Sequence, residues 1–244
     1  FILKKICAII PARYNSKRLP GKPLLKIKDK EILYLTYLKV RKIFSPEDIY
    51  IFTESKKLKN IMKNKISNIF VVKGKFRNGT ERSSAGLKFI KKKYYGSIIV
   101  SCDNPYLSLD SIYSTMNIFK KFYKDKSVAC TTVHTKSSSL KKFKNRSVAK
   151  VVLNKFNDII YLSRSPIPSL TKKYFHTHHG PVCLKNDILK KYIKFKFSSL
   201  QKDEDNEWLN LIFNGYKIKS KLVKNISREI NTKEDLRYYR NLKK

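Results

Sequence analysis

The 244-residue sequence predicts an α/β fold built on a mostly parallel central sheet. Two patterns predict it. Short runs rich in β-branched residues alternate with longer segments that carry apolar residues at helical spacing. Crossovers of that length join parallel strands and cover both faces of the sheet with helices. Because neither an internal repeat nor a Gly/Ser linker interrupts the chain, we expect residues 1–244 to form a single domain.

The first half of the chain alternates strand and helix in strict order. We expect buried strands at 6–10 (ICAII), 48–52 (DIYIF), 68–72 (NIFVV) and 97–101 (SIIVS). We expect helices between them at 31–43, 55–64 and 81–94.

The second half is less regular, mainly over residues 127–200. Strands are expected at 127–133, 148–154 and 158–163, the last two separated by a turn at 155–157. A looser stretch follows at 164–180, then a helix near 204–213 and a final helix from about residue 233.

The composition limits the classes of function. A formal net charge of +37 would suit a nucleic-acid or membrane-surface protein, but the lysines are spread over every segment, so a general lysine bias is favoured over a nucleic-acid partner. Cys7, Cys102, Cys130 and Cys183 have no CxxC spacing and predict buried free thiols in a reducing compartment. No apolar run approaches the length of a membrane span, and no signal peptide is recognisable, so we expect a cytoplasmic protein.

The loop after the first strand concentrates positive charge. Arg13, Lys17, Arg18 and Lys22 lie in one short turn around Gly21. Ligands of parallel sheets bind at the carboxyl ends of the strands, so we expect this loop to hold a polyphosphate. It has neither a Walker nor a dinucleotide spacing. A solvated lysine-rich loop is the alternative, although the prolines and Gly21 indicate a fixed backbone.

Four segments then resemble one family in order along essentially the whole chain. IIPARYNSKRLPGKPL (9–24) is similar to the signature of the sugar-activating cytidylyltransferases, and most of all to the 3-deoxy-manno-octulosonate cytidylyltransferase (CMP-Kdo synthetase) family. NGTER (78–82), SRSPIP (163–168) and INTKEDL (230–236) resemble further motifs of that family.

The resemblance implies a Rossmann-like nucleotidyltransferase (glycosyltransferase-A-like) fold, a homodimer, CTP as donor, magnesium, and a role in lipopolysaccharide biosynthesis. In the implied reaction, the anomeric hydroxyl of a 2-keto-3-deoxy sugar acid attacks the α-phosphorus of CTP and pyrophosphate leaves. Residues 127–200 would contribute to the sugar site and the dimer contact.

The resemblance also assigns roles to residues. Arg13 and Lys22 would bind the triphosphate and, with Asp103, carry the catalysis. Asp103 and Asn231 occupy the two metal-binding positions. The nucleotide would contact Ala12, Arg13, Ser16, Lys22, Gly79, Thr80 and Arg82, and the sugar would contact His178, Glu204 and Glu207.

Each assignment has a local alternative. Asp103 could form an N-cap or an Asx-turn with Asn104, and Asn231 could simply precede a capping box made by Thr232 and Asp235. Glu204 and Glu207, three apart in a helical pattern, could form a solvated helix face. The histidines at 176, 178 and 179 could suggest a metal site, although a polar loop near the sugar is favoured.

The chain also departs from the family pattern. SCDNP (101–105) stands where the family has Gln-Gly-Asp-Glu-Pro, and Val182 stands where a tyrosine approaches the sugar. Both changes fall on the acceptor side. Asn231 replaces an Asp, so an amide would take the place of a metal-binding carboxylate. A protein that holds nucleotide or nucleic acid without turnover is therefore the alternative function.

Overall fold

The computed structural model describes residues 5–16, 19–169, 173–178, 180–224 and 229–242. The chain divides into two compact units, one of residues 4–109 with 227–244, and the other of residues 1–3 with 110–226. We call them the N-unit and the M-unit. The expectation of a single domain over residues 1–244 stays a prediction.

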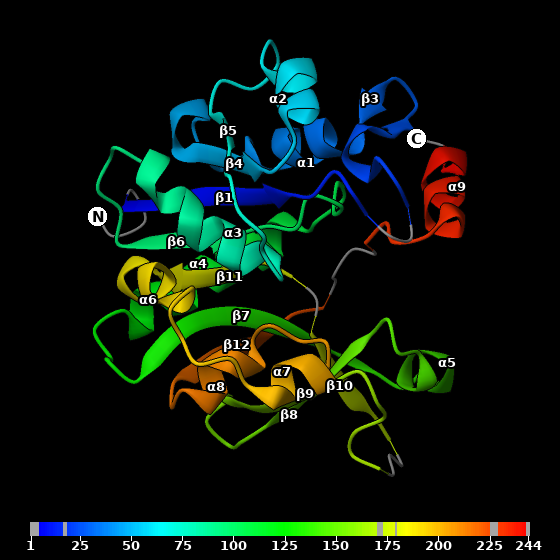
Figure 1. The fold of residues 1–244 in the computed structure, drawn as a ribbon. Coiled ribbons are helices and arrows are strands. Elements are labelled where there is room, and N and C mark those ends of the chain that lie inside the picture. The colour runs from blue at the N-terminus through cyan, green and yellow to red at the C-terminus, as the bar shows by residue number, and fades with distance from the viewer. Residues whose placement is uncertain (1–4, 17–18, 170–172, 179, 225–228, 243–244) are drawn as a thin grey trace. The chain divides into compact units, whose positions relative to one another are not determined.

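The N-unit contains four parallel strands in the order β5-β4-β1-β6. They are β1 (Ile6–Ala12), β4 (Ile49–Thr53), β5 (Ile69–Val71) and β6 (Gly96–Ile99). β1 is central, with β4 on one side and β6 on the other, and six of its seven residues are buried. Helices α1 (Ile32–Val40), α2 (Lys56–Met62) and α3 (Gly79–Gly86) flank these strands (Figure 1). The carboxyl ends of β1, β4 and β6 therefore lie at one edge.

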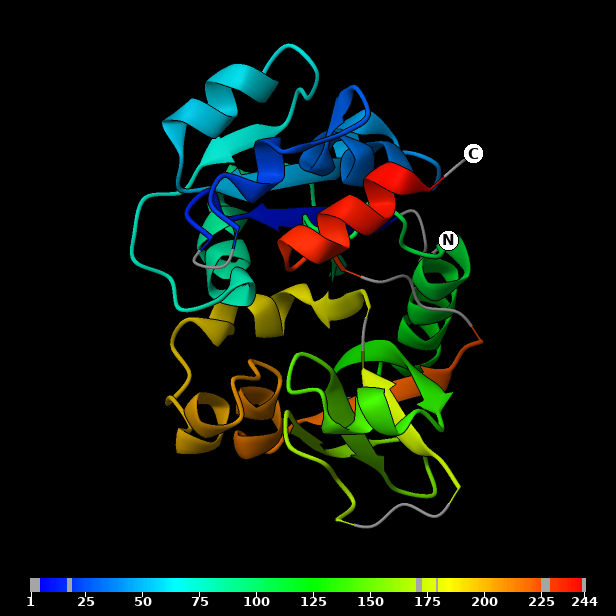
Figure 2. The ribbon, with the colours of Figure 1, turned by 90° about the vertical axis from the view of Figure 1, so that its right-hand side faces the viewer.

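The C-terminal helix α9 (Lys233–Asn241) belongs to the N-unit and lies beside a short hairpin of β2 (Lys26–Ile27) and β3 (Lys30–Glu31) (Figures 1 and 2). Thr232 and Asp235 form the expected capping box at its start. The helix is held by an apolar cluster that joins segments far apart in sequence: Leu19, Ile27, Ile32, Ile230, Leu236 and Tyr239. This cluster fixes the segment that leads into α9.

The M-unit contains a mixed sheet in the order β11-β7-β10-β8-β9, with β12 pairing parallel to β7. Its strands are β7 (Val128–Ser137), β8 (Ala149–Leu153), β9 (Ile159–Ser163), β10 (Phe175–His178), β11 (Val182–Lys185) and β12 (Lys217–Leu222). Its helices are α4 (Leu109–Phe122), α5 (Leu140–Lys144), α6 (Asn186–Tyr192), α7 (Ser199–Asp203) and α8 (Leu209–Phe213). All its strand pairings except β7–β12 are antiparallel.

Most predicted elements are confirmed, with one correction in the N-unit and two in the M-unit. The helix expected at 81–94 is α3 (Gly79–Gly86) with a 3₁₀ turn at Leu87–Phe89, so residues 90–94 are not helical. The helix expected near 204–213 is present only over Leu209–Phe213 (α8). Helix α7 ends before it at Asp203, and the chain then turns at Asp205, whose φ of 45° is left-handed. The stretch expected to be loose contains strand β10, so His176 and His178 lie on a strand instead of a loop. Strands β11 and β12 and helices α4, α5, α6 and α7 were not predicted.

The structure also bears on two expectations from the composition, those about the cysteines and about membrane spans. All four cysteines are free and buried, as predicted. None of the helices in the described ranges combines the length and the apolar character that a membrane crossing requires.

Candidate active site

The loop after β1 has a fixed backbone. Gly21 adopts a left-handed φ of 68°, where a residue without a side chain is favoured, and its N–H donates to the carbonyl of Tyr14 at 3.2 Å. The next residue, Lys22, starts a short 3₁₀ helix at 22–24. Ser16 lies in the same loop, and its N–H also donates to Tyr14 at 3.0 Å. Lys17 and Arg18 lie outside the described residues. The expectation that Gly21 shapes this loop is confirmed.

Lys22 joins two oxygen-bearing side chains that lie far apart in sequence. Its buried ammonium forms an ion pair with Asp103, in the loop that follows β6, and donates to Oδ1 of Asn231 at 3.3 Å. The hydroxyl of Ser101 donates to the other carboxylate oxygen of Asp103 at 2.5 Å. Burial opposes the charge of Lys22, but Asp103, with a smaller contribution from Glu229, raises its pKa above the usual value. Lys22 is therefore a permanent cation at this point.

Glu54 follows β4 and holds two parts of the site together. One carboxylate oxygen accepts from the backbone N–H groups of Tyr14 at 2.8 Å and Asn15 at 3.4 Å. The other lies 3.1 Å from the guanidinium of Arg82, which is 5% exposed. Burial, opposed by Glu54 and reinforced by Arg13, lowers the pKa of Arg82. Glu54 thus ties the β1 loop to helix α3.

Helix α3 begins against the end of β1. A Cβ added to Gly79 would lie 3.0 Å from the ring of Pro11, so a larger residue would need the helix or the ring to shift by a few tenths of an ångström. The side chain of Asn78 caps the helix by accepting from the N–H of Glu81 at 2.8 Å. Thr80 is fully buried next to Gly79. This places the NGTER segment at the carboxyl end of β1, where the sequence predicted a nucleotide.

Cys102 is the common neighbour of the charged residues. Burial and then the charge of Asp103 raise the pKa of its thiol to about 12, while Lys22, a backbone hydrogen bond from Arg13, and Arg82 act in the opposite direction. All four of these residues therefore influence the pKa of the Cys102 thiol. Two cations, Lys22 and Arg82, and the carboxylate of Asp103 therefore lie close to this thiol beyond the ends of β1 and β6. The backbone of Arg13 reaches the thiol directly after Ala12, the last residue of β1.

Sequence reasoning missed Glu54 and the position of Cys102. Glu54 comes directly after a strand that was predicted, and a polar residue at the carboxyl end of a parallel strand is the signal that could have identified it. Cys102 gave no signal beyond its apolar surroundings.

The donor set suits magnesium. Mg²⁺ in nucleotide sites takes one or two carboxylates and completes its shell with phosphate and water oxygens. The carboxylate of Asp103 and the amide oxygen of Asn231 both approach one cation, the ammonium of Lys22. Within the described ranges no group of three or more His, Cys, Asp or Glu residues could hold a metal. Magnesium binding at Asp103 and Asn231 stays a prediction.

The predicted sugar residues lie in the M-unit and already have protein partners. His178 is 8% exposed, and its Nε2 shares a hydrogen bond of 2.9 Å with Thr132. Glu204 accepts from Tyr161 at 3.2 Å, from Ser163 at 2.6 Å, and from the N–H of Arg164 at 3.0 Å.

The structure also places Glu207 and Val182, two other residues that the sequence assigned to the acceptor side. Glu207 lies between α7 and α8, so the prediction that Glu204 and Glu207 share a helical face is wrong. Val182, in place of the tyrosine of the family, is buried in β11. His179 lies outside the described residues.

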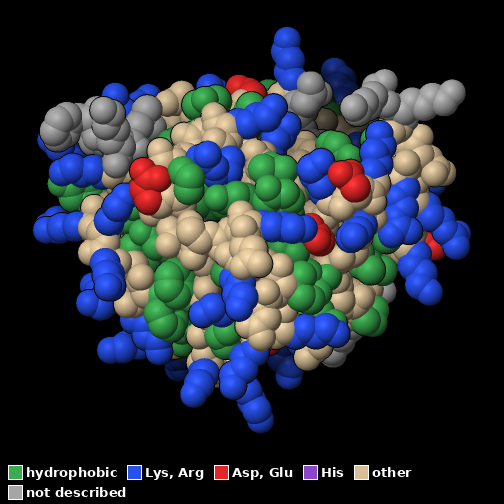
Figure 3. Space-filling model, turned by 90° about the horizontal axis from the view of Figure 1, so that it is seen from above, with side chains coloured by type: hydrophobic (Ala, Val, Ile, Leu, Met, Phe, Trp, Pro, Cys, Tyr) green, Lys and Arg blue, Asp and Glu red, His purple; other side chains and the backbone are tan. Residues whose placement is uncertain are grey.

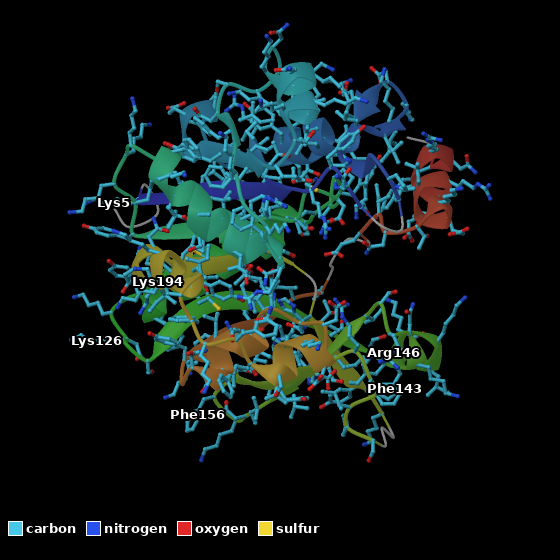
Figure 4. All side chains as sticks on the ribbon, viewed as in Figure 1. Lys5, Lys126, Phe143, Arg146, Phe156 and Lys194 are labelled. Carbon is cyan, nitrogen blue, oxygen red and sulfur yellow. The ribbon has the colours of Figure 1, made fainter. Side chains whose placement is uncertain are left out.

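Lys150 supports the same segment and was not predicted. Its ammonium donates to three backbone carbonyls, those of Asn145, Val148 and Arg164. Burial lowers its pKa to about 8, and the charges of Arg164 and of Arg146, labelled near α5 in Figure 4, add to this effect. Lys150 binds the carbonyl of Arg164 while Glu204 binds its N–H, so the start of SRSPIP is held from both sides.

The fold and the N-unit site define an α/β protein with buried cations beyond the carboxyl ends of its parallel strands, an arrangement that suits a phosphorylated anion. A family model described as cytidylyltransferase matches residues 7–219. A 3-deoxy-manno-octulosonate cytidylyltransferase of Fusobacterium nucleatum is 31% identical, over 88% of this chain and 87% of the relative. One of Parabacteroides distasonis is 29% identical over 96% of both chains. The chain therefore belongs to the cytidylyltransferase family, in its 3-deoxy-manno-octulosonate branch.

Solved structures agree. CMP:2-keto-3-deoxy-manno-octonic acid synthetase complexed with CTP matches with a TM-score of 0.86 and 25% identity, over 97% of both chains. A cytidylyltransferase from Leptospira borgpetersenii, 16% identical, matches with a TM-score of 0.57 over 95% of this chain and 83% of its own, which shows the fold alone. The predicted family and fold class are confirmed.

Proposed function

We propose that this protein is an enzyme that transfers the CMP group of CTP to a 2-keto-3-deoxy sugar acid, Kdo or a related acid, and releases pyrophosphate. The observation that carries the proposal is the buried ion pair of Lys22 with Asp103, in which Lys22 also donates to Asn231, together with the buried Arg82 that Glu54 ties to the β1 loop. The names of the curated relatives, and the CTP in one solved relative, support CTP as the donor and Kdo as the acceptor.

In the proposed mechanism, the protein acts by positioning and charge. The anomeric hydroxyl of the acid attacks the α-phosphorus in line with the leaving pyrophosphate. Lys22 and Arg13 stabilise the negative charge that spreads over the phosphate oxygens. Arg82, held by Glu54, adds further positive charge to the site. Asp103 and Asn231 would hold Mg²⁺, which neutralises phosphate charge when bound.

The predicted contacts divide between the two substrates. Ala12, Ser16, Gly79 and Thr80 surround the proposed nucleotide, all at or near the end of β1. For the acid, we propose His178, Glu204 and Glu207, with Glu204 acting through the Ser163–Arg164 segment that it holds.

We also propose a cytoplasmic homodimer that supplies lipopolysaccharide synthesis. The relatives' names support the pathway, and four free buried thiols fit a reducing compartment. Sedimentation of the purified chain tests the dimer, and cell fractionation tests the location.

A nucleic-acid role has less support. Lysine and arginine side chains are scattered over the face seen in Figure 3 and do not gather into one patch. A nucleic-acid binder would show a steep loss of affinity with added salt.

Pyrophosphate release tests the proposal. The full chain is incubated with CTP, Mg²⁺ and a panel of sugar acids that includes Kdo. We expect release with CTP and much less with ATP, GTP or UTP. Thermal stabilisation by CTP without release for any acid would indicate a protein that binds nucleotide without turnover. Equal stabilisation by ATP and CTP would contradict the assignment of CTP.

A further inference from the structure

The amide of Asn231 has a defined orientation. Its Oδ1 accepts from the ammonium of Lys22 at 3.3 Å, and its Nδ2 donates to Oε2 of Glu229 at 3.3 Å. Rotating the amide by 180° would turn its N–H groups towards the Lys22 ammonium and its oxygen towards a carboxylate. Both new contacts would be repulsive. Glu229 and Lys22 therefore direct the amide oxygen towards the point that Asp103 also faces.

The backbone holds Glu229 and Asn231 beside Asp103. Between them lies Ile230, fully buried in the apolar cluster under α9, and its N–H donates to the carbonyl of Asp103 at 2.9 Å. On the other side, the N–H of Asn231 donates to Asp235 of the capping box at 2.9 Å. The segment is thus fixed at both ends of the Glu229–Asn231 pair.

The charge of Glu229 reaches the same point. Together with Asp103, it is one of the negative groups that keep Lys22 charged. A site with Asp103 and an Asn alone would present one full negative charge to a divalent cation. Glu229 adds a second negative charge one side chain further out, on the far side of the Asn231 amide.

We propose that Glu229 is a positioning residue that compensates for the neutral Asn231. The two residues together would bind a divalent cation as a single carboxylate would. This inference rests on the proposed function. Glu229 orients the amide oxygen that contacts the cation, and its charge restores the attraction that an amide lacks. The cation is hard and oxygen-binding, of the Mg²⁺ or Mn²⁺ class.

A double-mutant cycle tests the proposal by metal binding, without turnover. Mn²⁺ affinity is measured by electron paramagnetic resonance on the full chain with CTP and no acceptor. Glu229→Gln should weaken Mn²⁺ binding about tenfold, the lower end of the effect for residues that orient a metal ligand. In the Asn231→Asp background, the same change should weaken binding less than twofold, because a carboxylate needs no orienting partner.

Two further variants control the cycle. Glu234→Gln removes an exposed negative charge from the first turn of α9 and should leave Mn²⁺ affinity unchanged. Glu229→Asp keeps the charge and should recover part of the affinity lost in Glu229→Gln. Thermal unfolding of each variant confirms that it is folded.

The outcomes separate this inference from the proposed function. An equal loss of affinity in both backgrounds, or no loss in the native background, would overturn the role of Glu229, as would a native chain that binds no Mn²⁺ with CTP. The expected cycle in a chain that releases no pyrophosphate with any acid would support Glu229 and reject the transferase.

Discussion

Lys22→Met is expected to separate the structural role of Lys22 from its catalytic role. The side chains of Lys22 and Asp103 are only 11% and 10% exposed, so methionine leaves a carboxylate buried without its counter-ion. Breaking such a pair costs about 3 kcal/mol of unfolding free energy. For a chain of this size, that lowers the melting temperature by roughly 6 to 12 °C.

The second variant, Lys22→Met with Asp103→Asn, removes the stranded charge. We expect it to recover most of the lost stability, because the buried amide no longer needs a counter-ion. Activity should follow a different course. In both variants kcat/KM should fall at least tenfold, on the order of 1.4 kcal/mol of transition-state stabilisation.

Calorimetry and pyrophosphate release measure the two effects on the same samples. A single variant that melts within 1 °C of the native chain, on a scale where about 1 kcal/mol shifts the transition by a few degrees, would show that no buried ion pair had been broken. A double variant that regains full activity would remove Lys22 from the chemistry.

Three other changes test the site and the fold. Arg13→Ala should reduce kcat/KM at least tenfold, by about 1.4 kcal/mol or more, with an unchanged melting temperature because the residue is exposed; unchanged kinetics would count against the loop. Glu54→Gln keeps an acceptor for Tyr14 but loses the charge beside Arg82, so it should raise KM for CTP, though less than Glu54→Ala does; an unchanged KM in Glu54→Gln would contradict the role of the ion pair. Burial lowers the pKa of His134 to about 4, so its contribution to stability is complete above pH 6.5 and is lost as the pH falls towards 4. His134→Gln should flatten the fall measured by denaturant titration, and identical profiles would refute this origin.

The nucleotide half of the site could be predicted because its signals are local. Gly21 and its prolines mark a fixed turn, Lys22 follows that turn directly, and Asp103 follows a strand whose apolar run is clear. In a parallel sheet, the ends of such strands converge, so neighbouring positions in space follow from the order of elements. The capping box at Thr232 was predictable for the same reason, since its partners are three residues apart.

The acceptor side was harder to predict because its contacts are distant in sequence. Glu204 carries the residue type expected of a sugar ligand, yet its partners, Tyr161 and Ser163, lie about forty positions earlier on β9. The break between α7 and α8 depends on Asp205 adopting a left-handed conformation. An Asp tolerates this conformation, but its presence in a sequence does not predict it. Similarly, nothing in the sequence distinguishes Lys150 from the other lysines of this basic chain, because its three carbonyl partners are brought together only by the fold.

The separation between Lys22 and Asn231, 209 positions along the chain, has a consequence for synthesis. A ribosome delivers the chain from its N-terminus, so the β1 loop, α3 and Asp103 emerge while the segment around Ile230 does not yet exist. The cations of the nucleotide site can assemble on the nascent chain, but the second oxygen and the Glu229 charge are made only about two hundred residues after Lys22. Divalent-cation-dependent binding of CTP would therefore appear only after Asn231 has been made, and its onset would report the docking of α9 on the nascent chain.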